Sequence, residues 1–385
     1  MLVFSYYYAS EVPTPVQEAA NYSWVCVLAF CGTACREYTG KWSAAMSMAP
    51  ALPSGGASDG FLEAVLFYDL LSNIIGSLCM GVLVGCAFFL LPRFPALYAG
   101  LTAGFCGCYT TFSSWMSESA AILARGQLTR GLLSLAVGLS LTLHACKLGV
   151  TVGAWLGTQL EQLEQRRTQR QRQTRTTSVS SAAVELHGGA AASSGTVELR
   201  VETSAGASCG STSKAPPPPP AAYPIYHSYK LPVGAGLLAL LVLGFVGVGA
   251  YGTAQPDHAL ARVSWGLVLS PLFASVRYTL SKHNRHHPML PRYTLLCNAL
   301  ATALAATCHT LSLAESVGAS GPTQMVLGAL SLGAAGCLST VSSFVNEVRL
   351  LPSPSAEIYA VLTLVAGQLA AVPIWVGVGY SSGFS

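Results

Sequence analysis

One short polar pattern occurs twice in this chain, each time inside a long apolar run. Residues 104–115 and 333–344 carry glycine, threonine and paired serines at the same relative positions, and a carboxylate follows each at Glu118 and Glu347. Hydroxyl groups and exposed backbone carbonyls can replace water around a small ion or solute. The chemistry that this pattern favours is therefore binding or passage of an ion, rather than a covalent reaction.

A stretch rich in glycine and hydroxyl residues is a poor membrane helix. Backbone that is not helical persists at membrane depth only where protein buries it or where it lines a polar path. Two such breaks in corresponding halves of a chain point to a site at the interface between the halves. We therefore expect a broken helix in each half and an ion or solute site between them.

Other polar and aromatic residues recur in both halves. Asn73 and Asn298 each lie in an apolar run, where an amide either offers donors to an anion or joins two helices through hydrogen bonds. Phe112 and Phe344 lie just after the breaks, and a ring edge carries partial positive charge that suits a small anion. Packing in the core is the ordinary role of such rings.

Each half also carries an arginine and a row of hydroxyls. Arg36 and Arg277 lie near the ends of apolar runs, either as charges at a vestibule or as interfacial anchors. In the last run of each half, Ser134 and the pair Tyr359 and Thr363 line up at helical spacing. Such hydroxyls can line an ion path, although singly they more often bond back to the helix.

The elements that must position these residues are membrane helices. Hydrophobic residues make up 52% of the chain and charged residues 9%, far below the share of about 25% in soluble domains. Runs of about 20 apolar residues mark the candidate spans. The spans fall at roughly 20–38, 64–91, 97–124, 131–156, 231–252, 259–281, 289–313, 323–349 and 356–379.

The fold class expected is an all-α polytopic membrane protein with two inverted four-helix repeats joined by one linking helix, nine spans in all. The expected segments are an N-terminal tail 1–19, a first repeat 20–158, a disordered linker 159–230, an inversion-linker helix 231–252 and a second repeat 259–380. An odd number of crossings inverts the second repeat relative to the first. Alternatively, 231–252 is an ordinary ninth helix.

The placement of basic residues predicts the orientation. The linker carries a run of five arginines between 166 and 175, which favours a cytoplasmic linker and N-terminus and an external C-terminus. The sequence has no P-loop and no zinc-protease pattern, so we expect no enzymatic activity. Apart from the two break-end glutamates, no carboxylate lies in the middle of a span, which argues against a proton-coupled cation exporter.

The paired motifs TTFSSW and STVSSF, the Asn-x-x-Gly run and the four-one-four layout resemble the fluoride channels of the Fluc/CrcB type. The fused form resembles the eukaryotic fluoride exporters (FEX) of that family. The resemblance implies a fluoride-selective channel that exports cytoplasmic fluoride and confers fluoride resistance. It also implies a channel that works as a monomer of two fused repeats in a lipid bilayer, most simply the plasma membrane. A dual-repeat transporter of the small multidrug type and a non-conducting scaffold are the alternatives.

The resemblance also assigns roles to residues. The implied vestibule positions are Arg36 and Arg277. The implied fluoride pore residues are Asn73, Phe112, Ser113, Ser134, Asn298, Phe344, Tyr359 and Thr363. A structural Na⁺ at the repeat interface would be held by the backbone carbonyls of Gly107, Thr110, Gly336 and Ser339.

The aromatic positions of the two halves differ. Trp115 and Val341 stand where the resemblance implies phenylalanine, and Arg130 stands where it implies tyrosine. The resemblance implies that each pathway draws its aromatic residues from both halves, so Phe112 and Phe344 would form one working pore. The other pore would be vestigial.

Overall fold

The computed structural model of the 385-residue chain is mostly helical in the residues that it describes. These are 13–45, 68–188, 258–287, 289–314 and 321–382, together with 244, 248 and 249. The predicted tail 1–19 lies mostly outside this set. So does nearly all of the predicted inversion helix 231–252.

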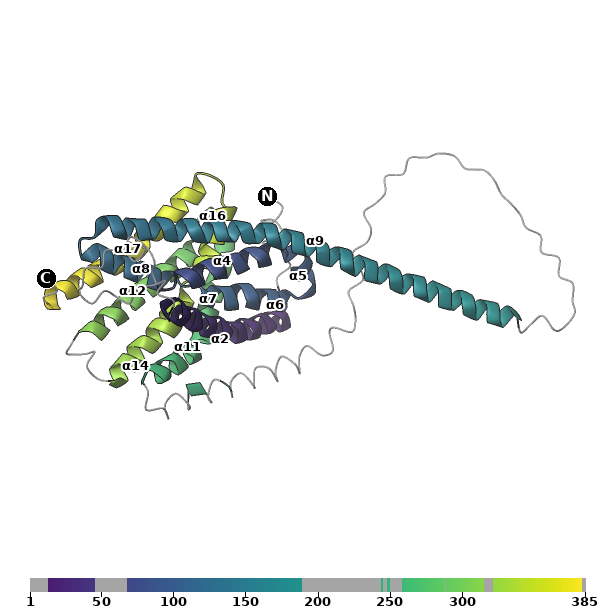
Figure 1. Cartoon of the computed structure of the whole chain (residues 1–385), viewed down its shortest axis with the longest axis horizontal. Coiled ribbons are helices and arrows are strands. Elements are labelled where there is room, and N and C mark those ends of the chain that lie inside the picture. The colour runs from purple at the N-terminus through teal and green to yellow at the C-terminus, as the bar shows by residue number, and fades with distance from the viewer. Residues whose placement is uncertain are drawn as a thin grey trace, which may run out of the picture. The chain divides into compact units, whose positions relative to one another are not determined.

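The first repeat begins with α2 (Pro15–Ala45), followed by α4 (Leu70–Gly85) and α5 (Ala87–Arg93), which are bent by 74° relative to each other. A broken helix follows. Its elements are α6 (Pro95–Ala99), the π-helical turn η1 (Gly100–Cys106), α7 (Gly107–Tyr109) and α8 (Phe112–Ala124). The long helix α9 (Leu128–Gly188) completes the repeat (Figure 1).

The second repeat has the same order of elements. Helix α11 (His258–Lys282) and a short 3₁₀ turn η3 (His283–His286) precede α12 (Arg292–Leu313). Its broken helix comprises α14 (Gly321–Ala329), the π-helical turn η4 (Leu330–Ala335), α15 (Gly336–Leu338) and α16 (Val341–Leu350). Helix α17 (Ser355–Ser382) ends the described chain.

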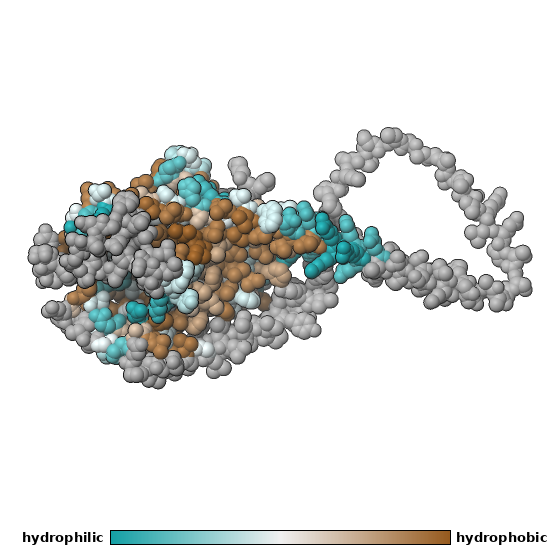
Figure 2. Space-filling view, viewed as in Figure 1, coloured by the Kyte–Doolittle hydropathy of each residue, from teal (hydrophilic) through white to brown (hydrophobic). Residues whose placement is uncertain are grey.

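The surface of the helical bundle is suited to lipid. Five described helical stretches are long and apolar enough to cross a membrane, or six if the bent pair α4 and α5 forms one span. Figure 2 shows apolar residues over much of the visible face of the bundle. Exposed apolar side chains on the outer helices include Leu132, Leu148, Leu272, Leu296, Leu300, Val361, Val365 and Leu369. The chain is an integral membrane protein.

Glycines let the helices approach closely. A Cβ atom on Gly81 or Gly85 of α4 would collide with backbone atoms of α9, and Gly149 and Gly153 of α9 meet α4 in the same way. Close backbone contact through small residues is the usual basis of helix association in membranes. The two repeats also pack directly on each other, because α2 of the first contacts α11 of the second.

Helix α9 extends further than the sequence suggested. The expected disordered linker begins at residue 159, whereas α9 stays helical to Gly188. The chain divides into two units, and the second, Gln159–Tyr229, begins where the expected linker begins. Residues 159–175 are rich in Glu, Gln and Arg, which are strong helix formers, so a helix that starts in the apolar run continues into them.

Candidate functional site

The two breaks have the same local structure. In each, a π-helical turn and one helical turn end at two extended residues, Thr110 and Thr111 in the first repeat and Ser339 and Thr340 in the second. The second residue then caps the next half-helix. Thr111 Oγ1 accepts a hydrogen bond from Ser114 N, and Thr340 Oγ1 accepts one from Ser343 N. The predicted broken helices are therefore present in both repeats.

Each predicted pore asparagine holds its own break in place. The Asn73 side chain accepts a hydrogen bond from Thr111 N (2.8 Å) and donates one to Thr111 O (3.0 Å). Asn298 makes the matching pair with Thr340 N (2.8 Å) and Thr340 O (3.2 Å). Both amides are fully buried, and each satisfies a backbone group that the break leaves without a helical partner.

The breaks also cap each other across the repeat interface. Ser339 Oγ accepts hydrogen bonds from Phe112 N (3.2 Å) and Ser113 N (3.1 Å), at the start of α8. In return, Thr110 Oγ1 accepts hydrogen bonds from Val341 N (3.2 Å) and Ser342 N (3.1 Å), at the start of α16. A hydroxyl from each repeat thus satisfies two free N–H groups of the other.

We expect Thr110→Val to lower stability, because it strands two buried N–H groups of α16 while preserving side-chain shape. Losing an N-cap costs about 1 kcal/mol, up to about 2. The matched control is Thr302→Val, since Thr302 Oγ1 only donates back to the carbonyl of Asn298 in its own helix (2.7 Å). Thermal unfolding in detergent measures both variants. Equal melting temperatures for the two would contradict the reciprocal capping.

The two arginines that the sequence left as vestibule charges or interfacial anchors are buried in the bundle. Arg36 and Arg277 are 3% and 4% exposed and donate to backbone carbonyls. Arg36 donates to the carbonyls of Cys108 (2.8 Å), Gly336 (2.9 Å) and Leu332. Arg36 thereby joins the break of its own repeat to the break of the other.

Arg277 of the second repeat makes the corresponding contacts with the first repeat. It donates to the carbonyls of Gly107 (3.0 Å) and Ala103 in the first repeat. The carbonyls at a helix C-terminus lack partners and carry partial negative charge. A planar guanidinium can serve several of them at once. The sequence could not reveal this role, because the carbonyls belong to a segment far away in the chain.

Two of the four carbonyls expected to hold a cation remain free for one. Thr110 and Ser339 are fully buried, and no donor to either carbonyl oxygen is found among the described residues. The Gly107 and Gly336 carbonyls each accept one hydrogen bond from arginine, which leaves a second lone pair on each. Such a set of buried oxygens fits a small hard cation.

The structure brings the two phenylalanines together beside the breaks. The Phe112 and Phe344 rings meet edge to face with centroids 5.7 Å apart, and Tyr359 packs on Phe344 at 5.6 Å. Trp115 contacts the other edge of Phe112 at 5.7 Å. All four side chains are fully buried.

Polar groups from three helices adjoin this ring cluster. Tyr359 donates to Glu347 Oε2 (2.6 Å), and Thr294 donates to Glu347 Oε1 (2.7 Å). Thr363 donates back to the carbonyl of Tyr359 (2.8 Å) in its own helix. Ser134 of α9 pairs instead with Ser119 of α8 (3.3 Å).

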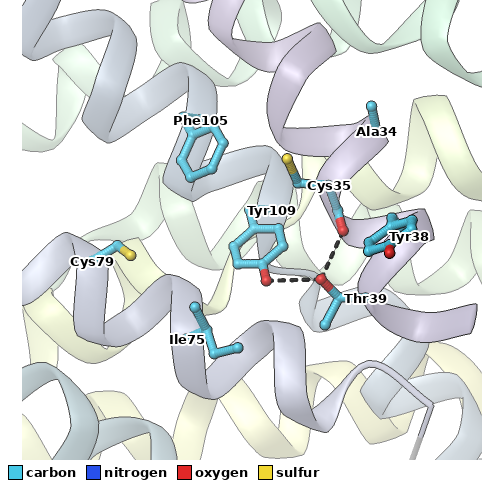
Figure 3. Close-up of a pocket in the computed structure, with 8 residues that line it drawn as sticks. All are labelled: Ala34, Cys35, Tyr38, Thr39, Ile75, Cys79, Phe105 and Tyr109. Carbon is cyan, nitrogen blue, oxygen red and sulfur yellow. Dashed lines mark hydrogen bonds between the residues drawn. The ribbon is translucent and has the colours of Figure 1, made fainter. Parts of the chain in front are cut away.

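A separate concavity lies on the outside of the first repeat. It has a volume of about 410 Å³ between α2, α4 and the π-helical turn, and it is lined mostly by apolar atoms (Figure 3). Its polar feature is Thr39, which pairs with Tyr109 (2.9 Å) and donates to Cys35 O (2.8 Å). None of its lining residues is a predicted site residue, although Tyr109 belongs to the helical turn α7 that precedes the first break.

Three further polar side chains near the site were not singled out on the sequence. Asp69 is buried and accepts a hydrogen bond from Ser114 Oγ (2.6 Å). His309 lies between two serines, and Gln368 donates to Met116 O (3.4 Å). Each is a polar residue within an apolar run, which is the signal that could have found it.

Comparison with known proteins identifies two regions. Residues 23–150 and 265–378 match the family described as CrcB-like protein, Camphor Resistance (CrcB). The chain is 35% identical over 102 residues to "Fluoride-specific ion channel FluC 2" of Synechococcus sp. (strain CC9902), covering 26% of this chain and 68% of the relative. No solved structure matches the chain.

Two more relatives illustrate the range of similarity. The protein of the same name from Prochlorococcus marinus (strain MIT 9313) is 41% identical over 87 residues, covering 22% of this chain and 64% of the relative. "Fluoride export protein 1" of Neurospora crassa is 30% identical over 135 residues, covering 34% of this chain and 26% of the relative. The chain thus spans roughly two thirds of the bacterial relatives and about a quarter of the fungal one.

Proposed function

Since this chain belongs to the CrcB-like family and carries two family regions, we propose that it is a fluoride-selective channel that exports fluoride from the cytoplasm. The relatives named for fluoride conduction or export support this function. The single observation that carries it is the meeting of the two breaks beside the Phe112–Phe344 ring pair. Fluoride moves passively, down its electrochemical gradient.

The path is formed by α8, α12 and α17, which pack on one another, and by α16, which packs on α12 and α17. Tyr359 packs on Phe344 and donates to Glu347, and a ring edge offers partial positive charge to a desolvated anion. Such an edge attracts fluoride without holding it as strongly as a full charge, so the ion can leave again. Ser113 belongs to the hydroxyl cluster at the breaks, where it accepts from Ser339 Oγ (3.0 Å).

The second pathway is vestigial in this proposal. The residue that corresponds to Phe112 in the second repeat is Val341, and the one that corresponds to Tyr359 in the first is Arg130. Arg130 donates to Gln127 (3.4 Å) at the start of α9. One pathway therefore has the paired rings and the tyrosine, whereas its counterpart lacks these groups at the same positions.

The architecture that goes with this function has nine spans. Residues 231–252 would supply the odd crossing that inverts the second repeat, and the mutual capping of the breaks supports an inverted pair. We place the N-terminus and the arginine-rich linker in the cytoplasm and the protein in the plasma membrane. One chain, with its two repeats, forms the working unit.

Purified protein in liposomes loaded with fluoride tests the function directly. We expect fluoride efflux, measured with a fluoride electrode, when a potassium ionophore relieves the charge imbalance. Chloride-loaded liposomes should show no comparable efflux. Efflux of neither ion would contradict the proposal, and coupled uptake of an organic cation would favour the multidrug-type alternative.

A structural sodium ion at the repeat interface completes the proposal. The carbonyls of Thr110 and Ser339 would hold it, with those of Gly107 and Gly336 contributing their remaining lone pairs. The ion would supply fixed positive charge and would satisfy oxygens that otherwise stay unpaired at membrane depth, where each costs several kcal/mol.

We expect sodium to raise the melting temperature of the detergent-solubilised protein. A ligand that binds only the folded state stabilises it by about 2.7 kcal/mol at a concentration 100 times its dissociation constant. The comparison uses sodium chloride and N-methyl-D-glucamine chloride at equal ionic strength. Melting temperatures that do not depend on sodium over this comparison would remove the cation from the proposal.

A further inference from the structure

A chain of hydrogen bonds lies on the conducting pathway at some distance from Glu347. Trp375 Nε1 of α17 donates to Ser117 Oγ of α8 (3.3 Å), and Ser117 Oγ contacts His309 Nδ1 of α12 (3.2 Å). On the other side of the ring, His309 Nε2 contacts Ser331 Oγ of η4 (3.1 Å). Three of the helices that form the path, α8, α12 and α17, thus meet again at this point.

Only one direction in this chain of hydrogen bonds is fixed by the groups involved. An indole N–H can only donate, so Ser117 Oγ accepts from Trp375. The roles of His309 toward Ser117 and Ser331 depend on which ring nitrogen carries the proton. A neutral imidazole has one N–H in either tautomer, so the cluster contains donor groups on Trp375, Ser117 and His309.

The cluster lies at the opposite end of the pathway from Glu347. In α12, Thr294 contacts Glu347, Asn298 lies at the break, and His309 follows further along. Helix α17 passes the same groups in the same order. Tyr359 bonds to Glu347, Gly367 lies against Phe112, and Trp375 bonds to Ser117. The ring pair thus separates the carboxylate from the histidine.

The cluster suits an anion in its charge. The hydrogen-bond partners found for His309 are the hydroxyls of Ser117 and Ser331, and no carboxylate is among them in the described chain. Ser117 is fully buried, whereas His309 is partly exposed. An anion that leaves the rings would therefore reach donor groups that otherwise serve one another.

Two of the three counterpart positions in the other pathway lack a comparable group. Val84 stands as far beyond Asn73 as His309 stands beyond Asn298, and Cys146 stands as far beyond Ser134 as Trp375 stands beyond Thr363. The counterpart of Ser117 is Asn346, whose amide also donates hydrogen bonds. At these positions the imidazole and the indole therefore accompany the paired phenylalanines and the tyrosine, whereas a donor at the third position occurs in both pathways.

We propose that His309, together with Ser117 and Trp375, forms a second hydrogen-bonding station for the transported anion, beyond the ring pair. This inference rests on the proposed function. His309 contacts the anion at this station, and Ser117 and Trp375 orient its ring and share the donor role.

The test compares His309→Leu with His309→Gln in the liposome efflux assay. Leucine fills a similar volume without hydrogen-bonding groups, and we expect it to slow fluoride efflux by about tenfold or more. Glutamine keeps a donor and an acceptor, so we expect it to retain most of the rate. Val84→Ala, at the counterpart position, is the matched control and should conduct like the unaltered protein.

Two further measurements separate this station from a structural role. Thermal unfolding should give similar melting temperatures for the leucine and glutamine variants, and Ser117→Ala should slow efflux little further when added to His309→Leu. Leucine and glutamine variants with equal efflux would overturn the inference. So would a leucine variant whose melting temperature falls in proportion to its rate. If the unaltered protein conducts no fluoride, the proposed function itself fails.

Discussion

Replacing Phe112 with isoleucine is expected to reduce fluoride efflux sharply, by about tenfold or more, which corresponds to at least about 1.4 kcal/mol in the barrier. The Phe112 ring is fully buried and meets Phe344 edge to face at 5.7 Å. Isoleucine is apolar but has no ring edge with partial positive charge. Fluoride would then pass this point without the group that compensates for its lost hydration.

Trp115→Ile is the comparison variant for this prediction. Trp115 contacts Phe112 but belongs to the position that corresponds to Phe344 in the other pathway, and it packs against Gly138 of α9. We expect a much smaller loss of efflux from this variant. If the two variants lose the same share of efflux while remaining folded, the idea of one working and one vestigial pore is wrong.

The largest expected loss of stability comes from Arg36→Met. Methionine keeps much of the length of arginine but donates no hydrogen bonds, so it strands the carbonyls of Cys108, Gly336 and Leu332. Each buried polar group left without a partner costs about 1–3 kcal/mol. A total of several kcal/mol corresponds to a fall in melting temperature of about 10 °C or more. Fluorescence-detected size exclusion after heating measures it.

Lys41→Met on the same helix is the matched control. The Lys41 side chain is 62% exposed and pairs with Glu37 at 3.4 Å, and such exposed ion pairs contribute about 0–1 kcal/mol. The melting temperature of Arg36→Lys should lie between those of the unaltered protein and Arg36→Met. A single ammonium group lacks the planar set of donors with which arginine reaches carbonyls of both repeats. A full loss of efflux with unchanged stability in Arg36→Met would instead favour a vestibule role and contradict the bridging role found here.

The structure and the sequence agree on which segments are broken. The breaks could be located from local composition alone, because glycine and hydroxyl residues disfavour a membrane helix wherever they occur in the chain. The apolar runs between them likewise predict helices, since the bilayer fixes the length of a span. Helix α9 continues past the end of its apolar run, because helix propensity carries it into Glu161 and Glu164.

The sequence by itself determined the two-repeat layout, the breaks and the residue types that surround them. Only the tertiary structure decided which groups those residues serve. Arg36, Asn73 and Ser339 each bind backbone atoms that lie far away in the chain, so their partners depend on how the repeats pack. Similarly, Ser117, His309 and Trp375 come from three separate helices, and each looks like an isolated polar residue until those helices meet.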